Sequence, residues 1–79
     1  MKEDKIKKYS TPIRVYGKGE LARMYFPRIS EESAVKRLMR WIHKSEELKS
    51  ELKQYDYKER ERTFTGRQVE AIFYHLGEP

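Results

Sequence analysis

The sequence predicts a small domain that is mostly α-helical with a minor β element. Apolar residues recur at helical spacing in four stretches, each with a recognisable start or stop signal. Only short segments show the alternation of β-branched and aromatic residues that is typical of strands. With 79 residues and 37% hydrophobic content, the chain can form one compact unit, whose thin core depends on six Tyr, three Phe and one Trp.

The N-terminal part is expected to contain an arm, a strand and a short helix. Residues 1–10 are charged and have no apolar run, which predicts a flexible basic arm ahead of a single domain over 11–79. Alternating β-branched residues predict a short strand over 11–16. A glycine-containing turn then leads into a helix near 19–26. Pro27 ends this helix, because the residue before a proline avoids the helical conformation.

Two consecutive helices are expected in the middle of the chain. Ser30 is a suitable N-cap for a helix over 31–44, which has two glutamates in its first turn. Ser45 can cap a following helix over 46–54. The pattern leaves open whether these are two helices or one bent helix, and we favour two.

The C-terminal part combines a predicted hairpin with the most clearly delimited helix. Aromatic residues flank a charged stretch within 55–64, a pattern that suits a short β-hairpin with a solvated tip. Thr65 and Gln68 form a capping box for a helix over 66–76, and Gly77 supplies its C-terminal stop.

The charge distribution narrows the class of partner. The net charge is +5, and the positive residues fall in blocks separated by acidic or neutral ones, as in small nucleic-acid-binding proteins. The same balance also fits the solubility of a small basic protein. The chain has no Cys, which excludes disulfides and thiolate metal sites. No run of residues could span a bilayer, so we expect a cytoplasmic protein without a membrane partner.

The helix predicted over 31–44 separates its charges from its apolar residues. One broad face of the helical wheel is apolar and includes Trp41. The opposite face carries four cations and no carboxylate, whereas solvated faces usually mix both signs. This basic face consists of Ser33, Lys36, Arg37, Arg40, His43 and Lys44.

The sequence does not indicate an enzyme or a cofactor site. Residues 17–22 match a glycine-rich dinucleotide-binding pattern, but that pattern requires a βαβ unit for which the chain is too short. His43 and His75 have no second His or carboxylate at ligand spacing on their own helices, so no metal is expected. We interpret His75 as a surface residue. Trp41 and the tyrosines could form a stacking platform for single-stranded nucleic acid, but aromatics at these spacings are more often core, and core is our expectation.

Several segments resemble known families. ELA at 20–22 followed by KRLMRWI at 36–42 resembles the helix-turn-helix of small bacterial DNA-binding proteins. The charged stretch and RTFT at 62–65 resemble the wing of MerR-like and excisionase winged-helix proteins. The landmarks YGKGELARMYFP, RWI, RTFTGRQVE and HLGEP resemble a family of short bacterial proteins of unknown function, over residues 16–79. The resemblances imply a winged-helix-like helix-turn-helix domain.

We therefore predict a non-enzymatic protein that binds double-stranded DNA, as a small transcriptional regulator or an excisionase-like accessory factor. The basic face would enter the major groove and contact bases or phosphates. The predicted hairpin would be the wing, and two further cations would hold flanking phosphates. These additional residues are Lys58, Arg60 and Arg62 in the wing, with Lys18 and Arg23 as the flanking pair.

Two other functions remain open from the sequence. The basic face could dock an acidic partner in a protein–protein adaptor, or exposed tyrosines could bind RNA. The sequence contains no coiled-coil seam that would specify an oligomeric state.

Overall fold

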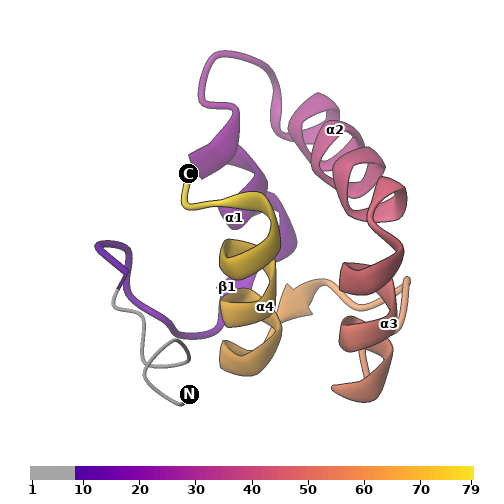
Figure 1. Ribbon diagram of the computed structural model, residues 1–79. Coiled ribbons are helices and arrows are strands. Elements are labelled where there is room, and N and C mark those ends of the chain that lie inside the picture. Colours follow the sequence, from indigo (N-terminus) through magenta and orange to yellow (C-terminus); the bar gives the residue numbers. More distant parts are fainter. Residues whose placement is uncertain (1–8) are drawn as a thin grey trace.

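The computed structural model describes residues 9–79 and contains four helices and a two-stranded sheet within that range (Figure 1). The elements, in chain order, are β1 (Tyr16–Gly17), α1 (Lys18–Tyr25), α2 (Glu31–Lys44), α3 (Glu46–Gln54), β2 (Thr63–Phe64) and α4 (Gly66–Leu76). The predicted mostly helical fold with a small β element is confirmed. The bounds of α2, α3 and α4 are those expected, and α1 lies one residue earlier in the chain than predicted.

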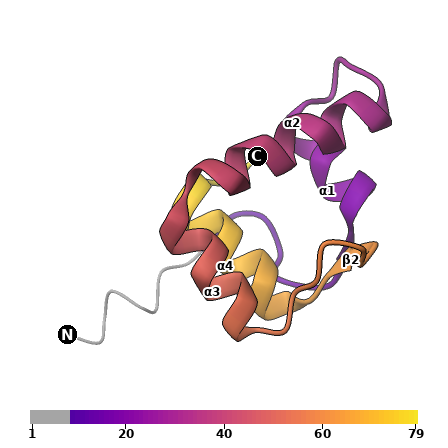
Figure 2. The same ribbon diagram turned by 90° about the vertical axis from the view of Figure 1, so that its right-hand side faces the viewer.

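The helices pack in two pairs around one core. α1 packs against α2, and α3 packs against α4 (Figures 1 and 2). The short sheet lies beside the start of α1 and the start of α4, so it joins the two pairs. Every element contributes fully buried side chains. This core consists of Tyr16, Leu21, Ala22, Ala34, Leu38, Ile42, Leu48, Leu52, Phe64, Val69, Ala71, Ile72 and Phe73.

The helix starts use the caps that the sequence predicts. The Ser30 hydroxyl accepts a hydrogen bond from the amide of Ser33 at 3.2 Å, and the Ser45 hydroxyl accepts one from the amide of Leu48 at 3.2 Å. Since Ser45 has an extended backbone with φ −99° and ψ 105°, α2 and α3 are two separate helices. A polar cap at each start satisfies amides that would otherwise lack partners.

The sheet corrects two expectations. The segment 11–15 is not a strand, and only Tyr16–Gly17 pairs, because Pro12 has no amide to donate and the chain from 12 to 15 is exposed. Nor does a hairpin form within 55–64. Residues 63–64 instead pair antiparallel with β1, in the register Tyr16 opposite Phe64. This pairing places two buried aromatic residues opposite each other. The highly charged stretch 58–62 has no aromatic residue that could pair with Phe64 in a hairpin.

The first described residues are attached to the C-terminal part of the chain. The Tyr9 ring packs edge-on against Phe73 with 5.7 Å between centroids. The backbone amides of Ser10 and Thr11 donate to the Glu78 carboxylate at 3.1 and 2.9 Å. Residues 9 and 10 of the predicted arm over 1–10 therefore contact the domain, and residues 1–8 lie outside the described part of the chain.

Gln68 is the one polar side chain in the described chain that is buried, at 4% exposure. Its Oε1 accepts from the amide of Thr65 at 3.0 Å, and its Nε2 donates to the carbonyl of Tyr55 at 2.8 Å. These bonds complete the predicted capping box of α4 and also hold the end of α3.

We predict that Gln68→Ala lowers the free energy of unfolding by about 2 kcal/mol, because it leaves the Tyr55 carbonyl and the Thr65 amide without their partner. Urea denaturation monitored by circular dichroism measures this change. Glu70→Ala on the same helix, at an exposed position, is the control and should change stability by less than about 0.5 kcal/mol. Equal effects of the two substitutions would contradict the role assigned to Gln68.

Candidate nucleic-acid interface

All six residues of the predicted basic face are exposed on α2. Ala34, Leu38 and Ile42 turn toward the core, and the cations turn away from it. Within residues 9–79, Lys36, Arg37, Arg40 and Lys44 have no ion pair with a carboxylate. Both ribbon views place α2 at the outer edge of the molecule (Figures 1 and 2), and the side chains of its basic face are exposed.

Trp41 corrects the expectation that it belongs to the core. Its side chain is 39% exposed, at the border between the apolar and basic faces of α2. The indole packs edge-to-face on Phe26, with 4.8 Å between centroids, and on Tyr25 at 6.2 Å. The buried face of α2 is therefore narrower than the sequence pattern predicts, because α1 and the following turn cover only one side of the indole.

The segment 57–62, which lies within the predicted hairpin 55–64, is a loop attached to the rest of the domain at both ends. We call this segment the charged loop. Tyr57 stacks on Phe64 with 5.3 Å between ring centroids, and its hydroxyl lies 3.8 Å from the sulfur of Met39 on α2. At the other end, the carbonyl of Arg62 accepts from the amide of Lys18 at 2.7 Å. The side chains of Lys58, Arg60 and Arg62 are exposed.

Glu59 joins the charged loop to α2 and to α1. Its carboxylate lies 2.9 Å from Nε2 of His43, at the C-terminal end of α2. Its carbonyl accepts from Nζ of Lys18 at 2.9 Å. The structure thus connects the loop to the end of the basic face, but it does so through a carboxylate that the sequence pattern did not single out.

The two predicted flanking cations differ in their surroundings. Lys18 is half-buried, and burial lowers its pKa, opposed by the nearby carboxylates of Glu59 and Glu61. Its ammonium group lies 5.2 Å from the centre of the Tyr57 ring. Lys18 therefore holds the charged loop, whereas Arg23, on the last turn of α1, is exposed.

The side chain of Tyr57, which attaches the charged loop, makes the stability of the fold depend on pH. Burial, followed by the charges of Glu59 and Glu61, raises its pKa to about 12. The folded state then keeps the phenol proton after the unfolded chain has lost it, so stability is complete below the usual tyrosine pKa and falls as pH rises toward 12.

We expect Tyr57→Phe to weaken this alkaline loss of stability, because the phenylalanine has no proton to release. Thermal melts between pH 9 and pH 11.5 would measure the change. Burial also raises the pKa of Tyr25, so part of the pH dependence should remain. An unchanged slope of melting temperature against pH in Tyr57→Phe would show that Tyr57 is not protected in the folded state.

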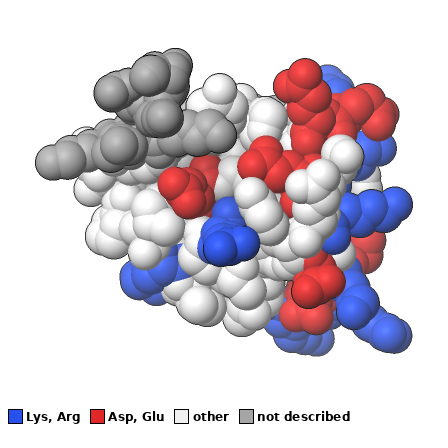
Figure 3. All heavy atoms as spheres, turned by 60° about the horizontal axis from the view of Figure 1, so that its bottom comes forward, with Lys and Arg blue, Asp and Glu red and all other residues white. Residues whose placement is uncertain are grey.

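On the other elements, cations lie next to carboxylates and not on a separate face. On α3, Nζ of Lys49 lies 3.5 Å from the carboxylate of Glu46. The charged loop carries Glu59 and Glu61 between its cations. Figure 3, which views the molecule from below, shows Lys and Arg interspersed with Asp and Glu on that face. Among the described helices, α2 is the one that presents several cations without intervening carboxylates.

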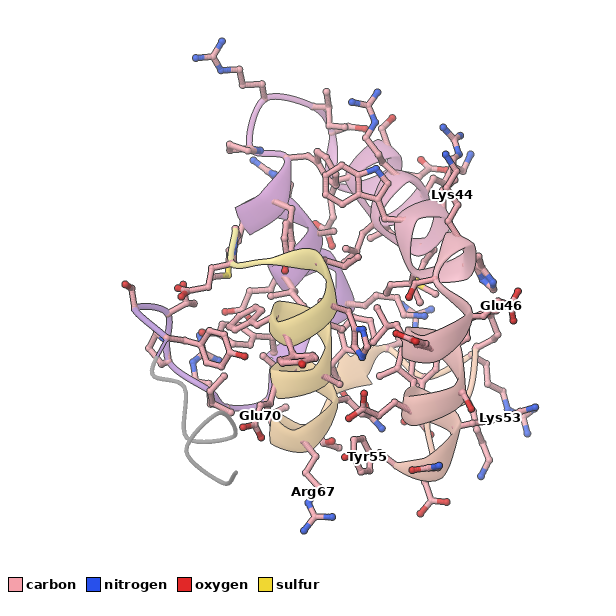
Figure 4. All side chains as sticks on the ribbon, in the orientation of Figure 1. Lys44, Glu46, Lys53, Tyr55, Arg67 and Glu70 are labelled. Carbon is pink, nitrogen blue, oxygen red and sulfur yellow. The ribbon has the colours of Figure 1, made fainter. Side chains whose placement is uncertain are left out.

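A groove of ≈ 380 Å³ lies between the C-terminal end of α2, α3 and the charged loop. Ile42, Leu52 and Tyr57 supply its apolar lining, and Glu46 and Lys53 are among its charged residues. Figure 4 shows Lys44, Glu46 and Lys53 pointing away from the body of the molecule along this side. The groove carries both signs of charge, so it does not extend the basic face.

A polar cluster between α3 and α4 was not predicted. Nε2 of His75 lies 2.8 Å from Glu51 Oε1, and the hydroxyl of Tyr55 donates to Glu51 Oε2 at 3.2 Å. The His75 side chain is only 14% exposed, so its interpretation as a surface residue was wrong. Its carboxylate partner lies on another helix, where spacing along α4 could not reveal it. The cluster stabilises the contact between the two helices.

Residues 9–79 contain neither a membrane-spanning helix nor a cluster of metal-ligating side chains. In that range, no helix combines the length and apolar composition that a bilayer crossing requires. The same residues contain no group of three or more His, Cys, Asp or Glu side chains that could hold a metal ion.

Comparison with known proteins identifies a family. No curated protein and no solved structure matches the chain significantly. The model of a domain of unknown function, DUF4248, matches residues 12–79, which include every helix and strand of the fold and both parts of the candidate interface. The predicted membership of a family of unknown function is therefore confirmed: the chain belongs to the DUF4248 family.

Proposed function

We propose that this protein binds double-stranded DNA through the basic face of α2. The observation that carries the proposal is the set of four cations on that face, none paired with a carboxylate in the described chain. Leaving four like charges together costs stability through their mutual repulsion, and a polyanion would relieve that repulsion. An α-helix also fits the major groove of B-DNA, where Arg and Lys can reach phosphates and guanine edges.

The arrangement around α2 supports a helix-turn-helix mode of binding. α1 packs across α2, and the turn 26–30 joins them, in the order of a helix-turn-helix unit. The charged loop is attached near the end of α2 through Glu59 and His43, so Lys58, Arg60 and Arg62 can serve as a wing. In this proposal the domain is winged-helix-like, resembles MerR-like and excisionase proteins, and acts on DNA in the cytoplasm as a regulator or accessory factor.

A salt titration on a mixed-sequence duplex tests the proposal. Each phosphate neutralised by a protein cation releases counterions, so affinity should fall steeply with salt. If the four cations of α2 each neutralise one phosphate, the slope of log K against log salt should be about −3.6. Fluorescence anisotropy of a labelled duplex between low and physiological salt measures it. The absence of salt-sensitive binding at low ionic strength would contradict the proposal.

The charged loop favours a second candidate function, that of an adaptor for an acidic protein partner. Glu59 and Glu61 would repel phosphates, whereas an interface between proteins accommodates both signs of charge. The two candidates differ in the same titration, because an adaptor would bind random duplex DNA weakly or not at all.

A further inference from the structure

Trp41 lies on one flank of the basic face, in a position that the major-groove proposal does not use. Around the axis of α2, Arg40 is opposite the buried residues, His43 turns toward the charged loop, and Trp41 turns toward α1. The two flanks therefore differ in chemistry. The loop flank is polar, and the flank next to α1 is aromatic.

The aromatic flank combines a ring that is partly open with nearby cations. The indole rests on Phe26 and Tyr25 and remains 39% exposed. Arg37, one turn earlier on α2, places its guanidinium 5.5 Å from the centre of the Phe26 ring. Lys44 follows Trp41 by one turn in the other direction. An apolar surface bracketed by unpaired cations fits a ligand that alternates apolar and anionic groups.

The sugar–phosphate backbone of DNA is such a ligand. An α-helix with its side chains is about 10–12 Å across and the major groove is about 12 Å wide, so a helix in the groove has its outer face at the bases and its flanks at the backbone walls. On the proposed placement of α2, Arg40 faces the bases and Trp41 faces one wall.

We propose that Trp41 packs against deoxyribose of the backbone wall next to α1, while Arg37 holds the adjoining phosphate. This inference rests on the proposed binding of duplex DNA by α2. The contact makes the two flanks inequivalent, because only one of them can bury an indole.

The inference can be tested on the unmodified protein, because Trp41 is its single tryptophan. Tryptophan emission and the anisotropy of a labelled mixed-sequence duplex are recorded in one titration, with free N-acetyltryptophanamide as the optical control. We expect saturable quenching of Trp41 with the same midpoint as the rise in anisotropy. A parallel titration with single-stranded oligothymidylate tests for stacking on unpaired bases.

The outcomes separate this inference from the proposed function. A rise in anisotropy with unchanged tryptophan emission overturns the inference and leaves duplex binding in place. No rise in anisotropy overturns both. Quenching by the single strand but not by the duplex also overturns the inference, because the ligand would then be an unpaired base.

A pair of matched variants gives a second measurement. Trp41→Ala should weaken duplex binding about tenfold, since it removes the indole that the proposed complex would bury. Tyr74→Ala removes an aromatic side chain that is 64% exposed on α4 and should leave the affinity unchanged. Equal affinities of the two variants would overturn the inference.

Discussion

Replacing both Arg37 and Arg40 with Glu is expected to weaken duplex binding on the order of a hundredfold or more. The substitutions remove two of the four unpaired cations on α2 and place two carboxylates at the centre of the basic face. Both side chains are exposed, and their removal breaks no ion pair in the described chain, so the fold should persist. Anisotropy titrations at several salt concentrations would give the affinity and, from a shallower slope, the phosphates no longer neutralised.

The matched control reverses two charges on α3. Lys49→Glu with Lys53→Glu changes the net charge by the same amount, but on a helix where cations and carboxylates already alternate. The one ion pair lost, Lys49 with Glu46, is exposed on both sides and contributes little to stability. If the α3 pair weakened binding as much as the α2 pair, binding would depend on net charge alone, and the assignment of α2 as the DNA-facing helix would fail.

The helices could be predicted from the sequence because their signals are local. Caps at Ser30, Ser45 and Thr65 lie within three residues of the amides that they bind, and the apolar spacing lies within each helix. The sheet could not be predicted in the same way. Its two strands, β1 and β2, lie far apart in the chain. Tyr16 lies opposite Phe64 because both side chains are buried in one core, and no local sequence pattern indicates this pairing.

In the candidate site, too, the features set by local sequence could be predicted, and those set by contacts between distant segments could not. The exposure of Lys36, Arg37, Arg40 and Lys44 follows from the helical wheel. The contact between Glu59 and His43, and the half-buried position of Lys18 under the charged loop, depend on how the loop returns to the sheet. For the same reason the periodicity of α2 could not predict the exposure of Trp41, which depends on how much of α2 the neighbouring helix α1 covers.

Phe64 is the side chain on which the sheet and the charged loop both depend. It is fully buried, lies opposite Tyr16 in the sheet and stacks on Tyr57 at the start of the loop. We expect Phe64→Ala to lower the free energy of unfolding by about 3–5 kcal/mol, from lost burial and the cavity left behind. A domain of this size has a total stability of about 4–12 kcal/mol, so the variant should lose at least about a quarter of that stability and, at the lower end of the range, all of it.

Two further variants test whether the loss of stability is specific to the Phe64 side chain or follows from any substitution in the sheet. Thr63→Ala, the exposed neighbour of Phe64 in β2, should change stability by less than about 0.5 kcal/mol. Phe64→Leu keeps most of the volume and should lose clearly less stability than Phe64→Ala. Urea midpoints at unchanged m-value measure the series. Phe64→Leu keeps an apolar side chain beneath the charged loop and leaves every cation of α2 in place, so it should bind DNA nearly as well as the unmodified protein. A folded Phe64→Leu protein with strongly reduced affinity would mean that the position of the charged loop, and not the basic face of α2 alone, determines binding.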